Sequence, residues 1–381
     1  NIAIDEKNER LQYHMMADSI ALPSNIFYST KISGNAAHDS LYVDAMTNDK
    51  NNKPWFGISS SIVSHLDAYR FRLKDNLILN YEKWKVNDQN YIQYNHDGLI
   101  VHQFQINNDT ASIRINSLTE TPNSPIDMNI DNFNLKSISS FISSDTLFAS
   151  GILDVKAKIT DMNQPLPAFT GTASIDHFAM MQQPLGNLTA QAQKISAAEI
   201  TSQIKLQGEG NDLTADLQYY LNNDQKQFDA SLDIHQLNVK PAGAFSGGLL
   251  KNTSGTIHGN MKLFGRFSDP QWKGFINADT VRFALTQYNI PYLIEDQKIN
   301  FDYPRIEMRE LLVADSADNN AKIDGYVAID KEQGFKLNLD VYANNFIIMN
   351  AQRAIDNQFY GLAMADADVS LRGSSEAPRI E

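Results

Sequence analysis

The chain contains the stretch GILDVKAKI at residues 151–159 and a diverged copy of it, GTIHGNMKL, at residues 255–263. A third copy begins at Gly361 and alternates apolar with polar residues as far as Leu371. The glycines that open the three copies are 104 and 106 residues apart. A nearly fixed period is typical of arrays in which each unit packs only on its neighbours, so the sequence predicts repeats of about 105 residues.

The segment upstream of each glycine repeats with similar spacing. It reads DNFNLK at residues 131–136, HQLNVK at 235–240 and, more faintly, NNFIIM at 344–349. Coincident markers on both sides of each glycine make chance a poor explanation. We expect an N-terminal segment followed by two repeat units and a truncated third, over residues 1–96, 97–200, 201–307 and 308–381.

Apolar and polar residues alternate within each unit. Phe335, Leu337, Leu339 and Val341, for example, are separated by Lys, Asn and Asp. A period of two places successive side chains on opposite faces of a strand, so each strand has one apolar and one hydrated face. Runs rich in Asn and Asp mark the turns. The pattern predicts an all-β fold, an elongated antiparallel β-groove.

Helical patterns are scarce. Three short candidates, Ser137–Ile142, Pro241–Leu250 and Ala351–Ile355, each follow the repeated upstream marker. Each is interpreted as a short helical turn or as a plain loop. The loop is favoured for the second candidate because its glycines, among them Gly243 and Gly247, oppose a helix. We therefore expect few short helices.

A long apolar sheet face cannot stay bare in water, because monomers rarely expose apolar patches larger than a few hundred Å². The face must curl over itself, pair with a second sheet or hold a ligand. Acyl chains suit such a face, since moving a chain of about 16 carbons through water costs about 0.8 kcal/mol per CH₂, or roughly 12 kcal/mol. The alternation assigns the lining of this predicted lipid groove to Ile126, Met128, Ile130, Leu153, Val155, Ile159, Phe228, Leu232, Ile234, Ile257, Met261, Leu263, Ile299, Phe301, Val327, Ile329, Phe335, Leu337, Leu339, Val341, Ala365, Val369 and Leu371. A register slip of one residue would invert this assignment.

Composition disfavours several classes of protein. A net charge of −13 argues against nucleic acid as a partner, since phosphate binding relies on clustered Lys and Arg. The chain has no cysteine, which excludes disulfides and thiolate metal sites. No apolar run approaches the roughly 20 residues that cross a bilayer as a helix. Because the sequence opens at Asn1 and stops at Glu381 within a repeat, we expect a fragment of a longer protein.

Motifs for catalysis are lacking. The sequence has no HExxH, GxSxG or phosphate-binding loop, and none of its eight histidines has a consistent carboxylate neighbour in the sequence. His96 and His102 flank an expected strand and could meet, but a place on the surface or in a turn is favoured. A calcium loop that starts at Asp315 fails because Ala317 stands where the second ligand should be. We expect no enzyme, no cofactor and no metal site.

Six triplets consist of Asp, then Ser or Thr, then an apolar residue. They begin at Asp18, Asp39, Asp109, Asp145, Asp279 and Asp315. The triplet resembles an O-glycosylation sequon of exported proteins in some Gram-negative bacteria. It also arises by chance and in Asx turns, so both interpretations remain open.

A family resemblance rests on the run LFGRFSDPQWKG at residues 263–274, followed by INF at 299–301 and AKIDG at 321–325. These residues resemble the C-terminal part of the TamB family, translocation and assembly module subunits of the AsmA-like group. The segment NYEKWKV at 80–86 resembles the tryptophan-bearing strand of that family. Similarity is strongest over 255–381, and the motifs are structural rather than catalytic.

The resemblance implies a periplasmic protein, anchored in the inner membrane, whose body is a taco-shaped β-groove related to bridge-like lipid transfer proteins. It implies a role in moving phospholipid to the outer membrane, and a BamA-like outer-membrane partner of the TamA type. The sequence thus predicts a lipid conduit. One alternative is a scaffold or chaperone that pairs outer-membrane client strands at its sheet edges. A closed β-solenoid or adhesin is disfavoured, since solenoid coils repeat every 20 to 30 residues or so.

Overall fold

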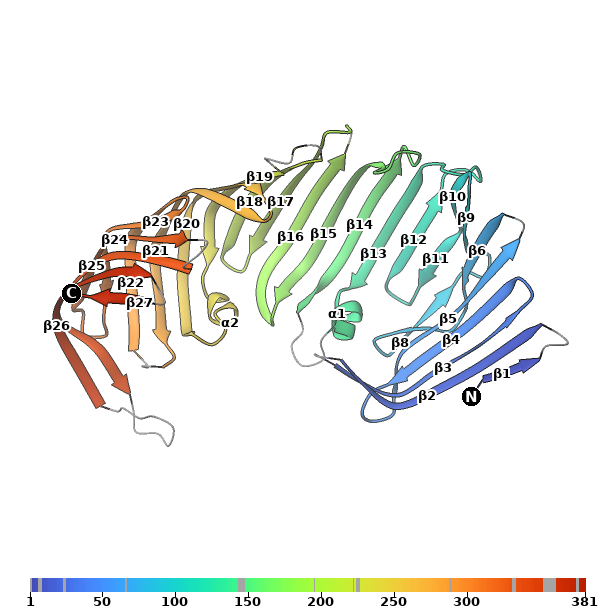
Figure 1. The fold of residues 1–381 in the computed structure, drawn as a ribbon, viewed down its shortest axis with the longest axis horizontal. Coiled ribbons are helices and arrows are strands. Elements are labelled where there is room, and N and C mark those ends of the chain that lie inside the picture. Colours follow the sequence, from blue (N-terminus) through green and yellow to red (C-terminus); the bar gives the residue numbers. More distant parts are fainter. Residues whose placement is uncertain are drawn as a thin grey trace. The chain divides into compact units, whose positions relative to one another are not determined.

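The computed structural model describes residues 2–381 except 6–8, 23–24, 66, 143–147, 195, 222, 224–226, 288–289, 331–333, 352–360 and 375–376. The described residues form 27 strands and two short helices, and every ladder among them is antiparallel (Figure 1). The predicted all-β class with few short helices is therefore confirmed. The chain divides into two compact units, Asn1–Ala197 (unit 1) and Ala198–Glu381 (unit 2). The predicted repeat boundaries at 96/97, 200/201 and 307/308 stay a prediction.

Unit 1 consists of sixteen strands and one helix. They are β1 (Ile2–Asp5), β2 (Arg10–Leu22), β3 (Asn25–Ala37), β4 (Ser40–Asn48), β5 (Pro54–His65), β6 (Ala68–Leu73), β7 (Leu77–Leu79), β8 (Glu82–Val86), β9 (Tyr91–Asn95), β10 (Gly98–His102), β11 (Phe104–Asn107), β12 (Ser112–Ser117), β13 (Ile126–Asn134), α1 (Lys136–Ile142), β14 (Ala149–Thr160), β15 (Ala168–Met180) and β16 (Gln183–Lys194).

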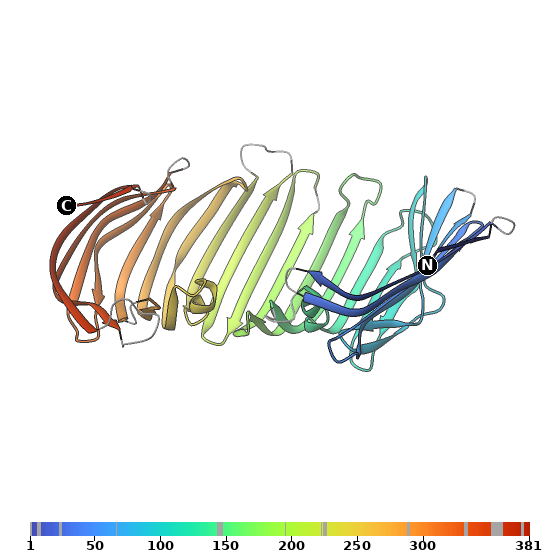
Figure 2. The same cartoon turned by 60° about the horizontal axis from the view of Figure 1, so that its bottom comes forward.

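Unit 2 consists of eleven strands and one helix. They are β17 (Glu199–Gly208), β18 (Asn211–Tyr220), β19 (Phe228–Asn238), α2 (Ala242–Phe245), β20 (Leu250–Arg266), β21 (Asp269–Leu285), β22 (Ile290–Asp302), β23 (Arg305–Ala314), β24 (Asn320–Asp330), β25 (Gly334–Ala351), β26 (Gly361–Ser374) and β27 (Ala377–Ile380). Consecutive strands pair in chain order, and many of them curve along their length (Figure 2).

At three successive positions in the sheet of unit 1, two short strands take the place of one long strand: β6 and β7, then β9 and β8, then β10 and β11. Strand β5 pairs with both β6 and β7, β6 then pairs with β9, and β7 pairs with β8. Asn90 lies buried in this break, where its side-chain amide donates to the carbonyl of Leu73 at 2.7 Å and its oxygen accepts from the Leu73 N–H at 3.0 Å. The amide therefore replaces ladder hydrogen bonds that the break removes.

β-Bulges interrupt many of the longer strands. The ladders shift register next to Asn132, His177, Glu310 and Asn345, all of which have positive φ. At three of them a carboxylate of the next strand accepts the bulged N–H; Asp324 and Glu310, for example, are joined at 3.0 Å. Because a bulge bends its strand, a series of bulges on neighbouring strands curves each sheet.

The buried core lies where the apolar face bends inward. In unit 1, Trp84 and Phe133 are each 2% exposed, and their rings lie 5.8 Å apart. In unit 2, Tyr292 of β22 stacks on Phe346 of β25 at 5.5 Å, although β23 and β24 lie between these strands in the sheet. Such a contact requires the sheet of unit 2 to curl with its apolar face inside.

The sequence repeat corresponds to a structural repeat. The N–H of Leu135 donates to Gly151 and the N–H of Val239 donates to Gly255, both at 3.0 Å, and a short helix follows the donor each time. Gly151, Gly255 and Gly361 all have positive φ. Similar residues thus occupy similar positions about 104 residues apart.

The helix predictions had mixed outcomes. Helix α1 (Lys136–Ile142) confirms the first candidate. The preference for a loop after Pro241 was wrong over α2 (Ala242–Phe245), because the helix begins directly after Pro241 as its N-cap, includes Gly243 and ends before Gly247 and Gly248. Of the third candidate, Ala351 ends β25 and the remainder lies outside the described residues.

Candidate functional site: an apolar sheet face

The predicted lining residues of unit 1 share one face of its sheet. In the ladder between β13 and β14, Ile126 is opposite Ile159 and Ile130 is opposite Val155. The bulge at Asn132 shifts the register so that Phe133 is opposite Leu153, which keeps an aromatic ring on the apolar face. The same face continues into β15, where Ile175 is opposite Leu153.

The predicted lining residues of unit 2 also share one face. Leu339 of β25 lies between Gly325 of β24 and Leu371 of β26, and Val341 is opposite Val369. The remaining ladders place the other predicted residues in register on this face, namely Phe228, Leu232, Ile234, Ile257, Met261, Leu263, Ile299, Phe301, Val327, Ile329, Phe335, Leu337 and Ala365. Contact of these residues with lipid stays a prediction.

The opposite face of each sheet is polar. Asp340 of β25 accepts hydrogen bonds at 2.6 Å from the Ser370 hydroxyl and from the Arg372 guanidinium of β26. In unit 1, Asp127 and Asn129 are opposite Lys158 and Lys156. Each unit therefore has one apolar face and one face of ion pairs and hydrogen bonds, as the alternation predicts.

The apolar face is only partly covered. Ile126 and Ile234 are 4% and 6% exposed, but Ile329 and Phe335 are 37% and 49% exposed, and most other predicted lining residues are half-buried. The core of a β-sandwich would bury such residues nearly completely against a second sheet. Large aliphatic side chains of this face therefore remain accessible within each unit.

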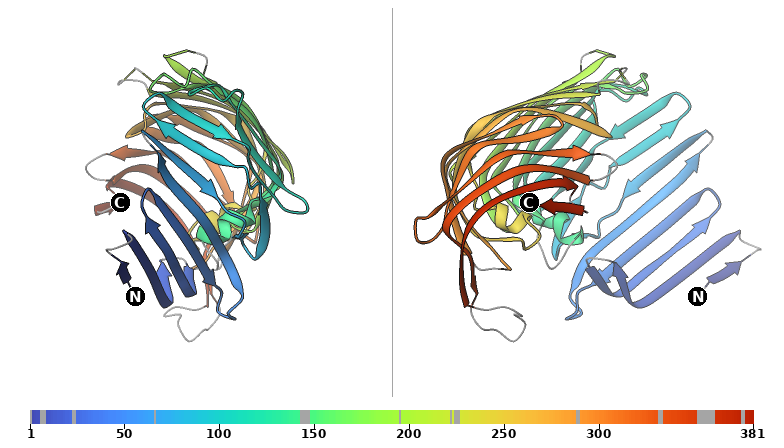
Figure 3. Two further views of the ribbon diagram at one scale, coloured as in Figure 1. Left: turned by 90° about the vertical axis from the view of Figure 1, so that its right-hand side faces the viewer. Right: turned by 60° about the vertical axis from the view of Figure 1, so that its left-hand side comes forward.

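An apolar pocket lies in unit 1, with a volume of about 470 Å³. Its walls include Ile32, Phe56, Ile58 and Leu79, and Ile138 of α1 forms one side. Helix α1 is held there by Asn25, whose side-chain amide donates to the Ser140 carbonyl at 3.0 Å. Figure 3 shows this helix beside the ends of the N-terminal strands of unit 1.

The prediction missed this pocket. Apolar residues do recur at every second position of its strands, as at Phe56 and Ile58, but Ser, Thr and Gly among them weaken the apolar pattern. The bond that joins α1 to β3 connects residues 115 positions apart, which no local pattern reveals.

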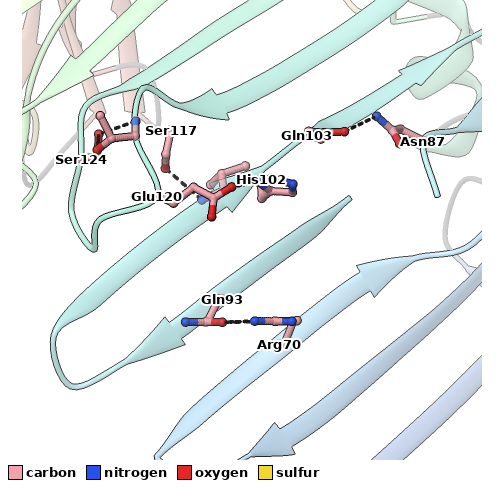
Figure 4. A network of polar contacts seen from close by, with 10 residues as sticks. Arg70, Asn87, Gln93, His102, Gln103, Ser117, Glu120 and Ser124 are labelled. Carbon is pink, nitrogen blue, oxygen red and sulfur yellow. Dashed lines mark hydrogen bonds and ion pairs between the residues drawn. The ribbon is translucent and has the colours of Figure 1, made fainter. Parts of the chain in front are cut away.

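The two histidines that could meet, His96 and His102, both lie on the β9–β10 hairpin. His96 lies in the turn of the β9–β10 hairpin while His102 is opposite Tyr91 at its other end, so the two do not meet. His102 stacks on Tyr91 at 4.5 Å, and its Nδ1 lies 3.0 Å from Glu120 Oε1 (Figure 4). His96 contacts the carboxylate of Asp97, its neighbour in the sequence, whereas the carboxylate partners of His102 and His258 come from other segments of the chain.

The turn at Asp315 is held by its carboxylate. Burial alone would raise the pKa of Asp315, but hydrogen bonds from the Ile347 N–H, the Asn319 amide and the Ala317 N–H together hold this pKa below its ordinary value. The Ile347 N–H lies 2.9 Å from Asp315 Oδ2 and ties the turn to β25. These donors engage both carboxylate oxygens, so Asp315 has a structural role.

Within the described part of the chain, no group of three or more His, Asp or Glu side chains could hold a metal ion. Among the same residues, no helix is long and apolar enough to span a membrane.

No protein-family model, no curated protein and no solved structure matches the sequence or fold significantly.

Proposed function

We propose that this chain is a groove segment that shields acyl chains and conducts phospholipid between the inner and outer membranes. The observation that carries the proposal is the continuous apolar face within each unit, formed by side chains in register on successive strands and left half-exposed. The TamB-like motifs support the same function, and with it a periplasmic location and a BamA-like partner.

The chemistry of the face suits a conduit better than a specific receptor. Leu337, Leu339, Val341 and Val369 offer contact area but no hydrogen-bond donor or acceptor to fix a ligand. Each CH₂ removed from water contributes about 0.8 kcal/mol wherever it lies on such a face. An acyl chain would therefore bind without a strongly preferred position, which favours movement along the sheet.

Binding of a phospholipid with a fluorescent acyl chain to the purified protein tests the proposal. Leu339→Asp places a carboxylate on the apolar face and is expected to weaken binding about tenfold, because the charge resists desolvation. Asn338→Asp, a change on the polar face opposite Arg372, is the matched control and should have little effect. Circular dichroism verifies that both variants fold. Equal tolerance of the two changes, or no binding by the parent protein, would refute the conduit.

A further inference from the structure

A second pocket of unit 1, of about 760 Å³, opens on the polar face of the sheet. Arg70, Arg72 and Lys74 line it and alternate with Phe71 and Leu73, so the three cationic side chains share the face opposite the apolar one. In the ladders, Arg72 is opposite Ser61 and Arg70 is opposite Gln93, both of which also line the pocket.

Arg70 is held in place before any ligand arrives. Its Nε and Nη2 donate to Gln93 Oε1 at 3.2 and 2.7 Å (Figure 4), and its guanidinium lies 4.4 Å from the centre of the Tyr91 ring. A guanidinium fixed by two hydrogen bonds and an aromatic face loses little further freedom on binding. Its Nη1 is not used in these bonds.

Neither Arg72 nor Lys74 has a side-chain hydrogen bond or ion pair among the described residues. The Asp44 carboxylate, on the same face, accepts a hydrogen bond from Ser59, the residue opposite it in the ladder. The acidic residues of the pocket, Asp67 and Asp97, lie in hairpin turns, and Asp67 precedes β6 whereas Lys74 follows it. At about 3.3 Å per residue, Asp67 and Arg72 are roughly 16 Å apart along the strand, about twice the screening length at physiological salt.

We propose that this pocket binds a phosphate group, either as the free anion or as part of a lipid headgroup. The planar guanidinium of Arg72 offers paired donors that match phosphate oxygens, Lys74 adds a mobile ammonium, and Arg70 supplies a fixed third cation. A chain with a net charge of −13 otherwise repels anions, which makes three cations that line one pocket a local exception. The site lies on the face opposite the acyl-shielding one, so it does not rest on the proposed conduit.

Isothermal titration with inorganic phosphate and flotation with vesicles test the proposal and distinguish the two sources. The vesicles contain phosphatidylglycerol in phosphatidylcholine, with pure phosphatidylcholine for comparison. Arg72→Gln removes the guanidinium and its paired donors and should weaken binding about tenfold. Arg72→Lys should weaken binding less because the charge remains. Lys83→Gln, which removes an exposed cation of β8 outside the pocket, is the matched control.

Binding of phosphate by the parent protein, weakened by Arg72→Gln and unchanged by Lys83→Gln, would support a site for the free anion. The same ranking with phosphatidylglycerol vesicles, without binding of free phosphate, would assign the site to a headgroup. Absence of binding to both probes, or equal losses in Arg72→Gln and Lys83→Gln, would overturn the proposal. Acyl-chain binding should persist in Arg72→Gln, so the outcome is separate from that of the conduit.

Discussion

Single residues at the repeat boundaries decide whether neighbouring strands can approach. Gly255 has a φ of +108°, and a Cβ built on it would lie 1.5 Å from the Thr280 carbonyl oxygen of the adjacent strand. Gly361 has a similar φ of +120°, yet a Cβ there would meet nothing within 4 Å. Substituting each glycine by alanine therefore separates the cost of backbone strain from the cost of a steric clash.

Gly255→Ala is expected to lower the free energy of unfolding by more than about 2 kcal/mol, since it adds a clash with backbone to an unfavourable φ. Gly361→Ala meets only the strain and should cost about 1 kcal/mol. Urea denaturation of the two variants measures the difference. Equal losses would show that the close approach of β20 and β21 at Gly255 is not required.

Asp315 makes the stability of unit 2 depend on pH. Its folded-state pKa lies below the ordinary value because of the donated hydrogen bonds, so its contribution is present above a pH of about 3.9 and is lost as the pH falls through the folded pKa. Asp315→Asn should increase hydrogen exchange in β25 strongly at pH 7 and progressively less as the pH falls below about 3.9. Asp318→Asn, at an exposed position of the same turn, is the control. A pH-independent difference between Asp315→Asn and the parent would contradict this role.

Where a strand of unit 1 is broken, a buried side-chain amide supplements the hydrogen bonds between the strands. Asn90 satisfies both backbone groups of Leu73 at the break between β6 and β7. Asn90→Ala leaves two buried polar groups without these partners and is expected to cost about 2–4 kcal/mol, measured by urea denaturation. Gln89→Ala, at an exposed neighbour, should cost less than about 0.5 kcal/mol. A small loss for Asn90→Ala would mean that water or a shifted side chain fills the break.

The sequence predicts regular elements well and irregular ones poorly. Alternation of apolar and polar residues identified strands such as β25, and the repeated marker located α1, because both depend on near neighbours along the chain. Bulges at His177 and Glu310 carry no distinctive residue type, so their positions could not be predicted. The contact between Tyr292 and Phe346 depends on how far the sheet curls, which is set by several bulges acting together.

At the scale of the whole molecule, the two faces of each sheet differ in chemical character. Within each unit the apolar face presents half-exposed aliphatic side chains, whereas the other face is covered by charges and amides. In unit 1 the apolar face includes the pocket beside α1, and the polar face includes the cluster of Arg70, Arg72 and Lys74. Lipid tails and anionic groups would thus bind on opposite sides of the same strands.

Site-specific photocrosslinking in cells with radiolabelled phospholipid tests the central claim most directly. The crosslinking side chain is placed at Leu337, Leu339 or Val369 on the apolar face and, as controls, at Asn338 or Asp368 on the polar face. A lipid-shielding groove predicts labelled lipid adducts at the first three positions and few at the controls. Adducts to protein alone, or no preference between the two faces, would contradict it.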